Sequence, residues 1–233
     1  MFYYYDFSYF LFMIPALIIS VIAQSRVQST FNKYSGVRSS KGLTAAEAAM
    51  RVLSYNGVEG VKIERVAGRL TDHFDPRTNV IRLSDDVYNS TSVAAIGVAA
   101  HEAGHAVQYA FGYMPIKIRQ IMLPITQFSS RLSMPLVFIG LLLPVQYDFI
   151  VTLGIALFSI AVLFELITLP VEFNASSRAI KTLDESDVMY GQELEGAKKV
   201  LKAAAMTYLA ATFTSLMSLI RLVLIAGQRR GRD

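Results

Sequence analysis

The chain contains no cysteine, and it is poor in charged residues for its length of 233 residues. The absence of thiols excludes disulfides, thiolate metal sites and cysteine nucleophiles. Charged residues make up 17% of the chain, against about 25% in soluble domains, while 53% are hydrophobic and the mean hydropathy is +0.42. This composition predicts a membrane protein, in which the small net charge of +4 reports topology and does not favour nucleic acid as a partner.

Four apolar runs predict about four transmembrane helices. The runs cover residues 7–23, 132–145, 149–170 and 203–226, and about 20 apolar residues cross a bilayer core. A short polar break separates the middle two runs, which predicts a transmembrane hairpin. The first arm of this hairpin is short, so it either begins upstream near Ile121 or does not cross completely.

The first run predicts a signal anchor and not a cleaved signal peptide. Positive charge follows the run, at Arg26, Lys33, Arg38 and Lys41, and no small-residue cleavage site is evident. By the positive-inside rule the N-terminus then lies outside and these four residues lie in the cytoplasm. Four crossings would leave the basic end of the chain, residues 229–232, outside as well. Either this tail breaks the rule or one of the four runs does not cross.

Two helices are predicted in the polar half of the chain that follows the anchor. Thr44 and Glu47 form a capping-box pattern, which opens a helix that ends at Asn56. The Ser-Thr-Ser run at 90–92 offers N-cap candidates for a second helix, residues 93–113, which is rich in alanine and valine and is therefore expected to be buried.

Two short β-like runs, residues 61–70 and 79–84, flank a turn and predict a β-hairpin between these helices. The expected fold is a mainly α membrane protein with about four transmembrane helices and a small cytoplasmic α+β domain. Its expected segments are an N-terminal transmembrane anchor (1–25), a cytoplasmic part (26–120), a transmembrane hairpin (121–170), a polar helix (171–202) and a C-terminal transmembrane helix with a basic tail (203–233).

The segment His101-Glu102-Ala103-Gly104-His105 matches the pattern H-E-x-x-H. Histidines four residues apart share one face of a helix and can bind one Zn²⁺. Glu102, beside the metal, can take a proton from a bound water and pass it to the leaving amine. Small Ala103 and Gly104 allow another element to pack closely behind the helix. A chance match is the alternative, but two imidazoles and a carboxylate on an apolar helix are costly unless something satisfies them.

A catalytic zinc usually has three protein ligands, so a further residue is needed. We predict Glu172, which follows Pro170 at the end of a long apolar run. A solvated helix N-terminus, which favours glutamate, is the alternative explanation for its position. Glu165, which lies inside the apolar run, and His73 are the competing ligands.

The chain resembles the YugP-like membrane zinc metallopeptidases over almost its whole length. Besides the anchor, three segments carry the resemblance: LTDHFDPRTNVIRLS, AAHEAGHAVQ and LPVEFNASSRA, of which the last two are specific. The resemblance implies a bacterial inner-membrane peptidase with a zincin-like domain. Its zinc site is of the gluzincin kind, in which a downstream glutamate, here Glu172, completes the His-His-Glu set.

The chain is also distantly similar to the HtpX and CAAX-prenyl protease group, whose second motif reads E-x-x-x-D. Ser176 stands where that motif has aspartate. It lies one turn from Glu172 and can support a ligand through a hydrogen bond. Asn174 is the alternative for this supporting role.

The resemblance further implies a cleft for the substrate. The NVIRLS segment, which includes Asn79, Val80 and Ile81, is expected as an edge strand to which a peptide adds; the alternative is that it only packs on the motif helix. A donor for the oxyanion is also expected. Arg178 and His73 are the candidates, although His73 also fits an ordinary loop histidine.

Two other functions compete with peptide hydrolysis. An intramembrane protease of the site-2 type also uses H-E-x-x-H but needs a later aspartate in an apolar segment, and no Asp-Gly follows His105. A non-catalytic zinc-binding scaffold, or an adaptor for another protease, would not need Glu102, because a structural zinc is closed by four ligands.

The sequence therefore predicts a zinc-dependent metalloendopeptidase of the bacterial inner membrane with its active site on the cytoplasmic side. Expected substrates are membrane proteins or unfolded segments close to the lipid bilayer. Other membrane proteases and chaperones are candidate partners.

Overall fold

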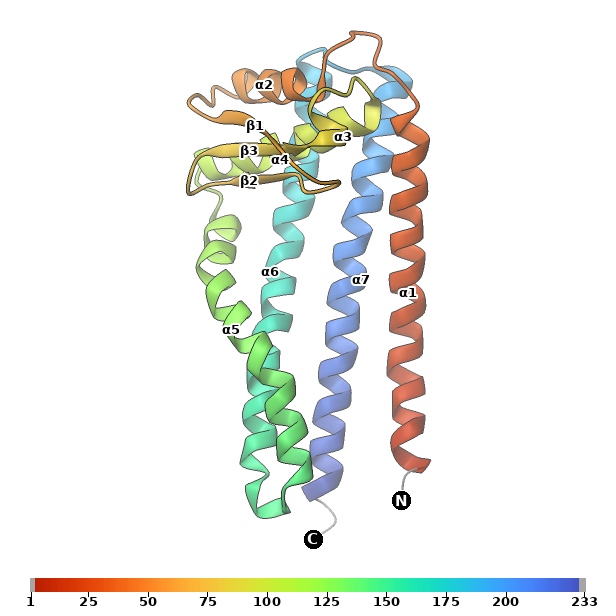
Figure 1. Cartoon of the computed structure of the whole chain (residues 1–233), viewed down its shortest axis with the longest axis vertical. Helices are drawn as coiled ribbons and strands as arrows, with labels where there is room; N and C mark the ends of the chain where they lie inside the picture. Colours follow the sequence, from red (N-terminus) through yellow and green to blue (C-terminus); the bar gives the residue numbers. More distant parts are fainter. Residues whose placement is uncertain (1–2, 231–233) are drawn as a thin grey trace. The chain divides into compact units, whose positions relative to one another are not determined.

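The structure, a computed structural model, describes residues 3–230, with side chains from residue 9 to residue 229, and it is mainly helical (Figure 1). Its helices are α1 (Tyr3–Ser35), α2 (Ala45–Tyr55), α3 (Asp85–Tyr88), α4 (Val93–Ala110), α5 (Met114–Leu142), α6 (Phe149–Glu185) and α7 (Gly191–Arg230). Its strands are β1 (Lys62–Val66), β2 (His73–Asp75) and β3 (Val80–Ser84), and a short 3-10 turn, Val145–Tyr147, lies between α5 and α6.

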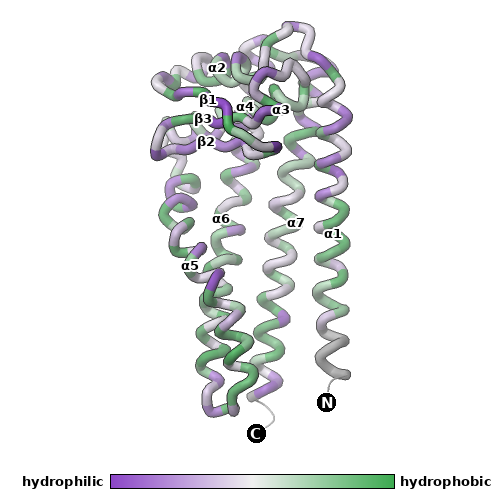
Figure 2. Tube along the Cα trace, in the orientation of Figure 1, coloured by the Kyte–Doolittle hydropathy of each residue, from purple (hydrophilic) through white to green (hydrophobic). Residues whose placement is uncertain are grey.

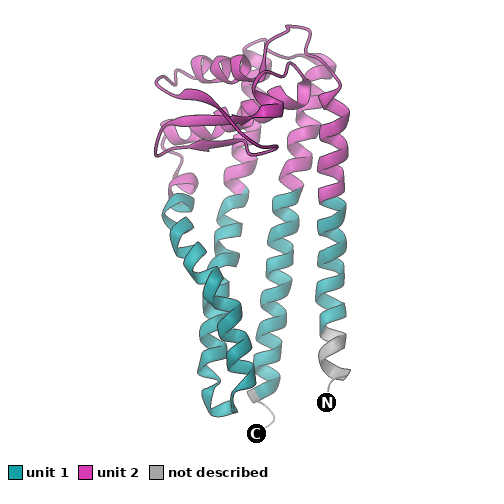
Figure 3. Cartoon of the chain, viewed as in Figure 1, with its two compact units in different colours: residues 1–23, 118–169, 207–233 teal, residues 24–117, 170–206 magenta. Residues whose placement is uncertain are grey.

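The chain forms two compact units that are built from alternating stretches of sequence (Figure 3). Unit 1 contains residues 1–23, 118–169 and 207–233, and unit 2 contains residues 24–117 and 170–206. Helices α1, α5, α6 and α7 each continue from one unit into the other. Unit 2 therefore contains most of the expected cytoplasmic part together with the expected polar helix, which were predicted as separate segments of the chain.

Unit 1 consists of the apolar parts of four helices. Helices α1, α5, α6 and α7 are long and apolar enough to cross a membrane, and Figure 2 shows hydrophobic residues along much of each helix in this unit. These four candidate spans agree with the expected number. Helix α5 begins at Met114, upstream of Ile121, and its 29 residues are ample for a bilayer core of about 30 Å.

The C-terminal end of α7 is attached to the connection between α5 and α6. The Arg229 guanidinium donates from Nη1 to the Gly140 carbonyl at 2.6 Å and from Nη2 to the Leu143 carbonyl. Its Nε lies 3.8 Å from Asp148 Oδ1, and both charged side chains are largely buried. The end of the last helix and the hairpin turn therefore lie at the same end of unit 1.

Unit 2 contains a three-stranded sheet in the order β1-β3-β2. Strand β2 pairs antiparallel with β3, whereas β1 pairs parallel with β3 on its other side. The expected hairpin of residues 61–70 with residues 79–84 is therefore wrong: β1 pairs parallel with β3, and the antiparallel partner of β3 is β2, across the turn at residues 76–79. The prediction that residues 79–84 supply an edge strand is wrong: β3 has a partner on both sides, because the chain forms two strands, not one, before it.

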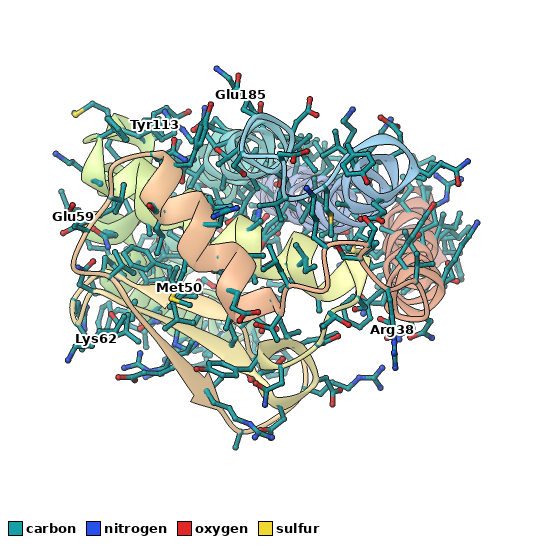
Figure 4. The ribbon with its side chains drawn as sticks, turned by 90° about the horizontal axis from the view of Figure 1, so that it is seen from above. Arg38, Met50, Glu59, Lys62, Tyr113 and Glu185 are labelled. Carbon is teal, nitrogen blue, oxygen red and sulfur yellow. The ribbon has the colours of Figure 1, made fainter. Side chains whose placement is uncertain are left out.

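The core of unit 2 lies where α2 packs on α4, an arrangement visible from above in Figure 4. The predicted helix starts are both confirmed. The Thr44 side chain accepts from the backbone of Glu47, whose carboxylate accepts in return from Thr44, and Ser92 caps α4. Alanines line the contact between the two helices, which lets their backbones approach closely. Apolar residues from the sheet, α6 and α7 complete this core: Ile81, Leu83, Ala179, Leu183, Ala197 and Leu201.

Helix α4 approaches α6 closely at Gly104. A Cβ atom at this position would lie 2.6 Å from the carbonyl oxygen of Ala175, which real side chains do not tolerate. The prediction that small residues in the motif allow close packing is thus confirmed for Gly104. This contact brings the face of α4 that carries His101 and His105 to the turns of α6 that carry Glu172.

Helix α6 runs without a break through Pro170. Glu172 is therefore an interior residue of a long helix and does not begin a new one, which corrects the helix N-terminus alternative. Proline lacks the N–H of the regular helix bond, yet the helix continues to Glu185. A short connection then leads to Gly191 and α7, so the predicted polar helix of residues 171–202 is the end of one helix and the start of another.

We expect the Gly104→Ala variant to lose stability and metal binding, because the added methyl group must separate α4 from α6. Overpacking of this kind costs about 1–3 kcal/mol. Gly97→Ala on the same helix is the matched control, since its Cβ would meet the Ala197 side chain at an ordinary 3.6 Å. Thermal unfolding of the detergent-purified variants measures the difference, and equal unfolding temperatures for the two would contradict the packing argument.

Candidate metal centre

The structure brings His101, His105 and Glu172 together in unit 2. The Nε2 atoms of His101 and His105 lie 3.2 and 3.5 Å from the same carboxylate oxygen, Glu172 Oε2. One ligand atom from each of the three residues lies within 4.8 Å of the others. The Glu172 side chain is only 2% exposed, and both imidazoles are largely buried.

The position of this group follows from helix geometry. His101 and His105 are one turn apart on α4, so their rings stand side by side, with centroids 4.7 Å apart and planes at 80°. Glu172 faces them from α6, and the contact of Gly104 with Ala175 determines which part of α6 lies beside the two histidines. Within the described part of the chain, these three residues form the group that could hold a metal ion.

The three donors fit zinc. Bonds of about 2.1 Å to a tetrahedral zinc separate neighbouring ligand atoms by about 3.4 Å, which matches the two distances of 3.2 and 3.5 Å to Glu172 Oε2. Two imidazoles and one carboxylate are also a donor set that zinc favours. A carboxylate as buried as that of Glu172 is costly unless it is paired or coordinates a metal.

Glu102 lies next to this group and is bound by the sheet. Its Oε2 atom accepts a hydrogen bond of 3.0 Å from the backbone N–H of Phe74, in β2. Desolvation raises the pKa of the Glu102 carboxyl above its ordinary value, while the His101 side chain and the Phe74 N–H act in the opposite direction. The residue as a whole is partly buried, and the bond from Phe74 ties its carboxylate to β2.

Each histidine has a partner on its other ring nitrogen. His101 Nδ1 lies 3.1 Å from Ser176 Oγ, and His105 Nδ1 lies 3.0 Å from Gln108 Oε1. Ser176 is a predicted supporting residue, whereas Gln108 was not predicted. Helical spacing could have found it, because Gln108 lies three residues after His105 and seven after His101, on the same face of α4.

The structure joins Asn174 and Arg178 to this region through Gln108. Gln108 Nε2 donates to the Val171 carbonyl at 2.8 Å and to Asn174 Oδ1 at 3.0 Å. Arg178 Nε donates to the same Asn174 oxygen at 2.8 Å. Asn174 therefore contacts the partner of His105, while Ser176 contacts His101 directly.

The other predicted site residues lie elsewhere in unit 2. His73 is exposed, and its Nδ1 lies 2.8 Å from the Thr71 carbonyl. Asn79 adopts a positive φ of 56° at the turn and donates to the Gly60 carbonyl. Val80 and Ile81 are buried in β3, the middle strand, so the backbone of this segment cannot add a peptide as an edge strand.

Glu165, the competing third ligand, belongs to unit 1. Its carboxylate accepts a hydrogen bond of 2.9 Å from Ser215 of α7. The acidic residue that is grouped with the two histidines is Glu172.

Comparison with known proteins identifies the family of this chain. The family model described as "Putative neutral zinc metallopeptidase" matches residues 9–227. The chain belongs to this family. It is also 48% identical over 225 residues to the protein named "Putative membrane protease YugP" of Bacillus subtilis (strain 168), across 96% of this chain and 98% of the relative. No solved structure gives a significant match. The recognition of the YugP-like family from sequence is thereby confirmed.

We expect the Glu172→Ala variant to lose bound zinc, because it removes one of three donors. Glu165→Ala is the matched control: it removes a glutamate from the same helix that contacts Ser215 instead of the histidines. Zinc per chain, measured by elemental analysis of detergent-purified protein, should fall for Glu172→Ala and stay at the wild-type ratio for Glu165→Ala. The reverse pattern would make Glu165 the ligand.

Proposed function

We propose that this protein is a zinc-dependent metalloendopeptidase that hydrolyses peptide bonds of membrane proteins or of unfolded segments close to the bilayer. The observation that carries the proposal is the position of Glu102, a carboxylate beside the His101–His105–Glu172 group that is tied to β2 by the Phe74 N–H. A purely structural metal site needs no such carboxylate. Membership of the neutral zinc metallopeptidase family supports the same reaction.

In this proposal His101, His105 and Glu172 hold the metal in a gluzincin-like arrangement. Zinc, when bound there, supplies a Lewis acid for the substrate carbonyl and a water of lowered pKa. Glu102 accepts the proton of the attacking water and later delivers it to the amine of the departing peptide. The Phe74 N–H holds the carboxylate through one oxygen, Oε2, and in this proposal the other oxygen, Oε1, takes the proton.

The small α+β part of unit 2 fits a zincin-like domain, in which a motif helix lies against a sheet. The edge of the sheet next to Glu102 belongs to β2, the outer strand, and not to β3. We therefore place an extended substrate along β2. This strand has only three residues, so few main-chain bonds are available, and side-chain contacts must supply much of the affinity.

The proposed location is a bacterial cell membrane, with unit 2 on the cytoplasmic side. Unit 2 contains Arg26, Lys33, Arg38 and Lys41, as the positive-inside rule requires of cytoplasmic segments. The end of α7 then lies outside, where Arg229 contacts the α5–α6 turn, while residues 231–233 of the basic tail lie outside the described residues. Arg229 is largely buried against backbone carbonyls and Asp148, so this arginine is not a free positive charge. The lipid bilayer is a partner in any case, and membrane proteases or chaperones are proposed protein partners.

We expect Glu102→Gln to keep its zinc and to lose peptidase activity by about 10²–10⁴-fold, because only the proton acceptor is removed. Hydrolysis of fluorescently labelled casein by the zinc-loaded protein in liposomes measures the rate. Glu59→Gln, at an exposed position of unit 2 (Figure 4), is the control and should keep the wild-type rate. Unchanged hydrolysis by Glu102→Gln would rule out Glu102 as the base.

The absence of cysteine makes the topology testable with single introduced thiols. Lys62→Cys labels an exposed position of β1 in unit 2 (Figure 4), and Gln146→Cys labels the exposed α5–α6 turn in unit 1. In intact cells a membrane-impermeant maleimide should react with Gln146→Cys alone, and with both variants after permeabilisation. Reaction of Lys62→Cys in intact cells would place unit 2 outside.

A further inference from the structure

Gln108 is completely buried between α4 and α6. Its side-chain amide contacts His105 on its own helix and Val171 and Asn174 on α6. A buried amide is costly unless its hydrogen bonds are made. Three of the four that an amide group can make are present here, which indicates a fixed orientation and not an accidental position.

Arg178 determines which atom donates and which accepts in each hydrogen bond of this series. A guanidinium only donates hydrogen bonds, so the atom of Asn174 that faces Arg178 Nε at 2.8 Å must be the side-chain oxygen. The same oxygen faces Gln108 at 3.0 Å, so the Gln108 atom in this contact must be the nitrogen. The Val171 carbonyl, 2.8 Å from the same nitrogen, can likewise only accept.

This assignment determines the tautomer of His105. Both hydrogens of the Gln108 nitrogen are used, so the group that faces His105 Nδ1 at 3.0 Å is the amide oxygen, Oε1. An amide oxygen only accepts, and Nδ1 must therefore carry a hydrogen. In the neutral imidazole the lone pair is then on Nε2, the atom that lies 3.5 Å from Glu172 Oε2.

We infer that Gln108, held by Asn174 and Arg178, is a positioning residue that commits His105 to bind metal through Nε2. It also ties α4 to the Val171 carbonyl, immediately before Glu172, so that one side chain fixes two of the three ligands. The inference rests on the metal-binding part of the proposed function and not on peptidase activity. Partners of this kind on metal-bound histidines commonly change metal affinity by about 10–100-fold when they are removed.

His101 offers a contrast within the same site. Its Nδ1 faces Ser176 Oγ at 3.1 Å, and a serine hydroxyl can rotate to donate or to accept. This contact orients the ring of His101 but does not determine its tautomer. The two histidines are therefore fixed to different degrees.

The first test is the protonation of Nδ1 in the wild-type protein. The chain has three histidines, so selective ¹⁵N labelling gives a spectrum simple enough to assign in liposomes by solid-state NMR. Nδ1 of His105 should carry a hydrogen with and without zinc, and the signals of exposed His73 serve as an internal reference. An unprotonated His105 Nδ1 would overturn the inference, and this measurement does not require that zinc binds or that the protein cleaves peptides.

The second test is the zinc dissociation constant, measured by competition with a chelator. Gln108→Met, similar in size but without the amide, should raise the constant by about 10–100-fold. Gln108→Glu keeps an acceptor for His105 and should leave Nδ1 protonated, while it loses both donors to α6.

Arg178→Met, at a partly exposed position, should weaken zinc binding less than Gln108→Met. The double variant should be no weaker than Gln108→Met alone, because both residues act through one chain of contacts. Fully additive effects, or a dissociation constant within about 2-fold of wild type for Gln108→Met, would overturn the inference. Absence of zinc from the wild type would instead contradict the proposed function.

Discussion

The rest of unit 2 depends on the interaction between a nearly buried carboxylate and the two imidazoles that it faces. Glu172 is 2% exposed, and 67 residues separate it in sequence from the nearer histidine, His105. A lone charge in this position would be strongly destabilising, and the pairing must be geometrically good to offset its desolvation. The close approach of α4 to α6, with glycine at the contact, provides that geometry.

The features that the sequence predicted are those that depend on neighbours along the chain. The capping box of Thr44 and Glu47 and the pairing of His101 with His105 each depend on a spacing of three or four residues, which a helix converts into contact. The choice of Glu172 over Glu165 as a ligand remains a prediction. The geometry favours it, because α6 carries both glutamates and only Glu172 lies in the group with the histidines.

The features that were missed depend on contacts between distant segments. The strand order could not be predicted because β1 reaches β3 across a loop and a further strand, and parallel pairing leaves no mark on the alternation of side chains. Pro170 was taken as a helix boundary, yet α6 continues through it. For Gln108, helical spacing shows that it shares a face of α4 with the two histidines, but its partners on α6, Val171 and Asn174, are known only from the structure.

The structure also shows a relation between the sheet and the helix of the H-E-x-x-H motif that differs from the predicted one. Strand β2, which lies between the two β-like runs predicted from the sequence, touches Glu102 through the backbone of Phe74. A backbone donor is insensitive to the identity of its side chain, so it leaves little signature in the sequence. The sheet thus contributes to the site by its position, and the motif helix contributes by its side chains.

The contact of Gly104 with Ala175 bears on how this centre could be transplanted into another scaffold. In the pattern H-E-x-x-H the two central positions are unrestricted, yet here the second of them must lack a Cβ atom for α6 to bring Glu172 to the two histidines. A designer who copied only the two histidines and the two glutamates would build helices too far apart to share an ion. The unit that must be transferred is the pair of helices together with the glycine that sets their spacing.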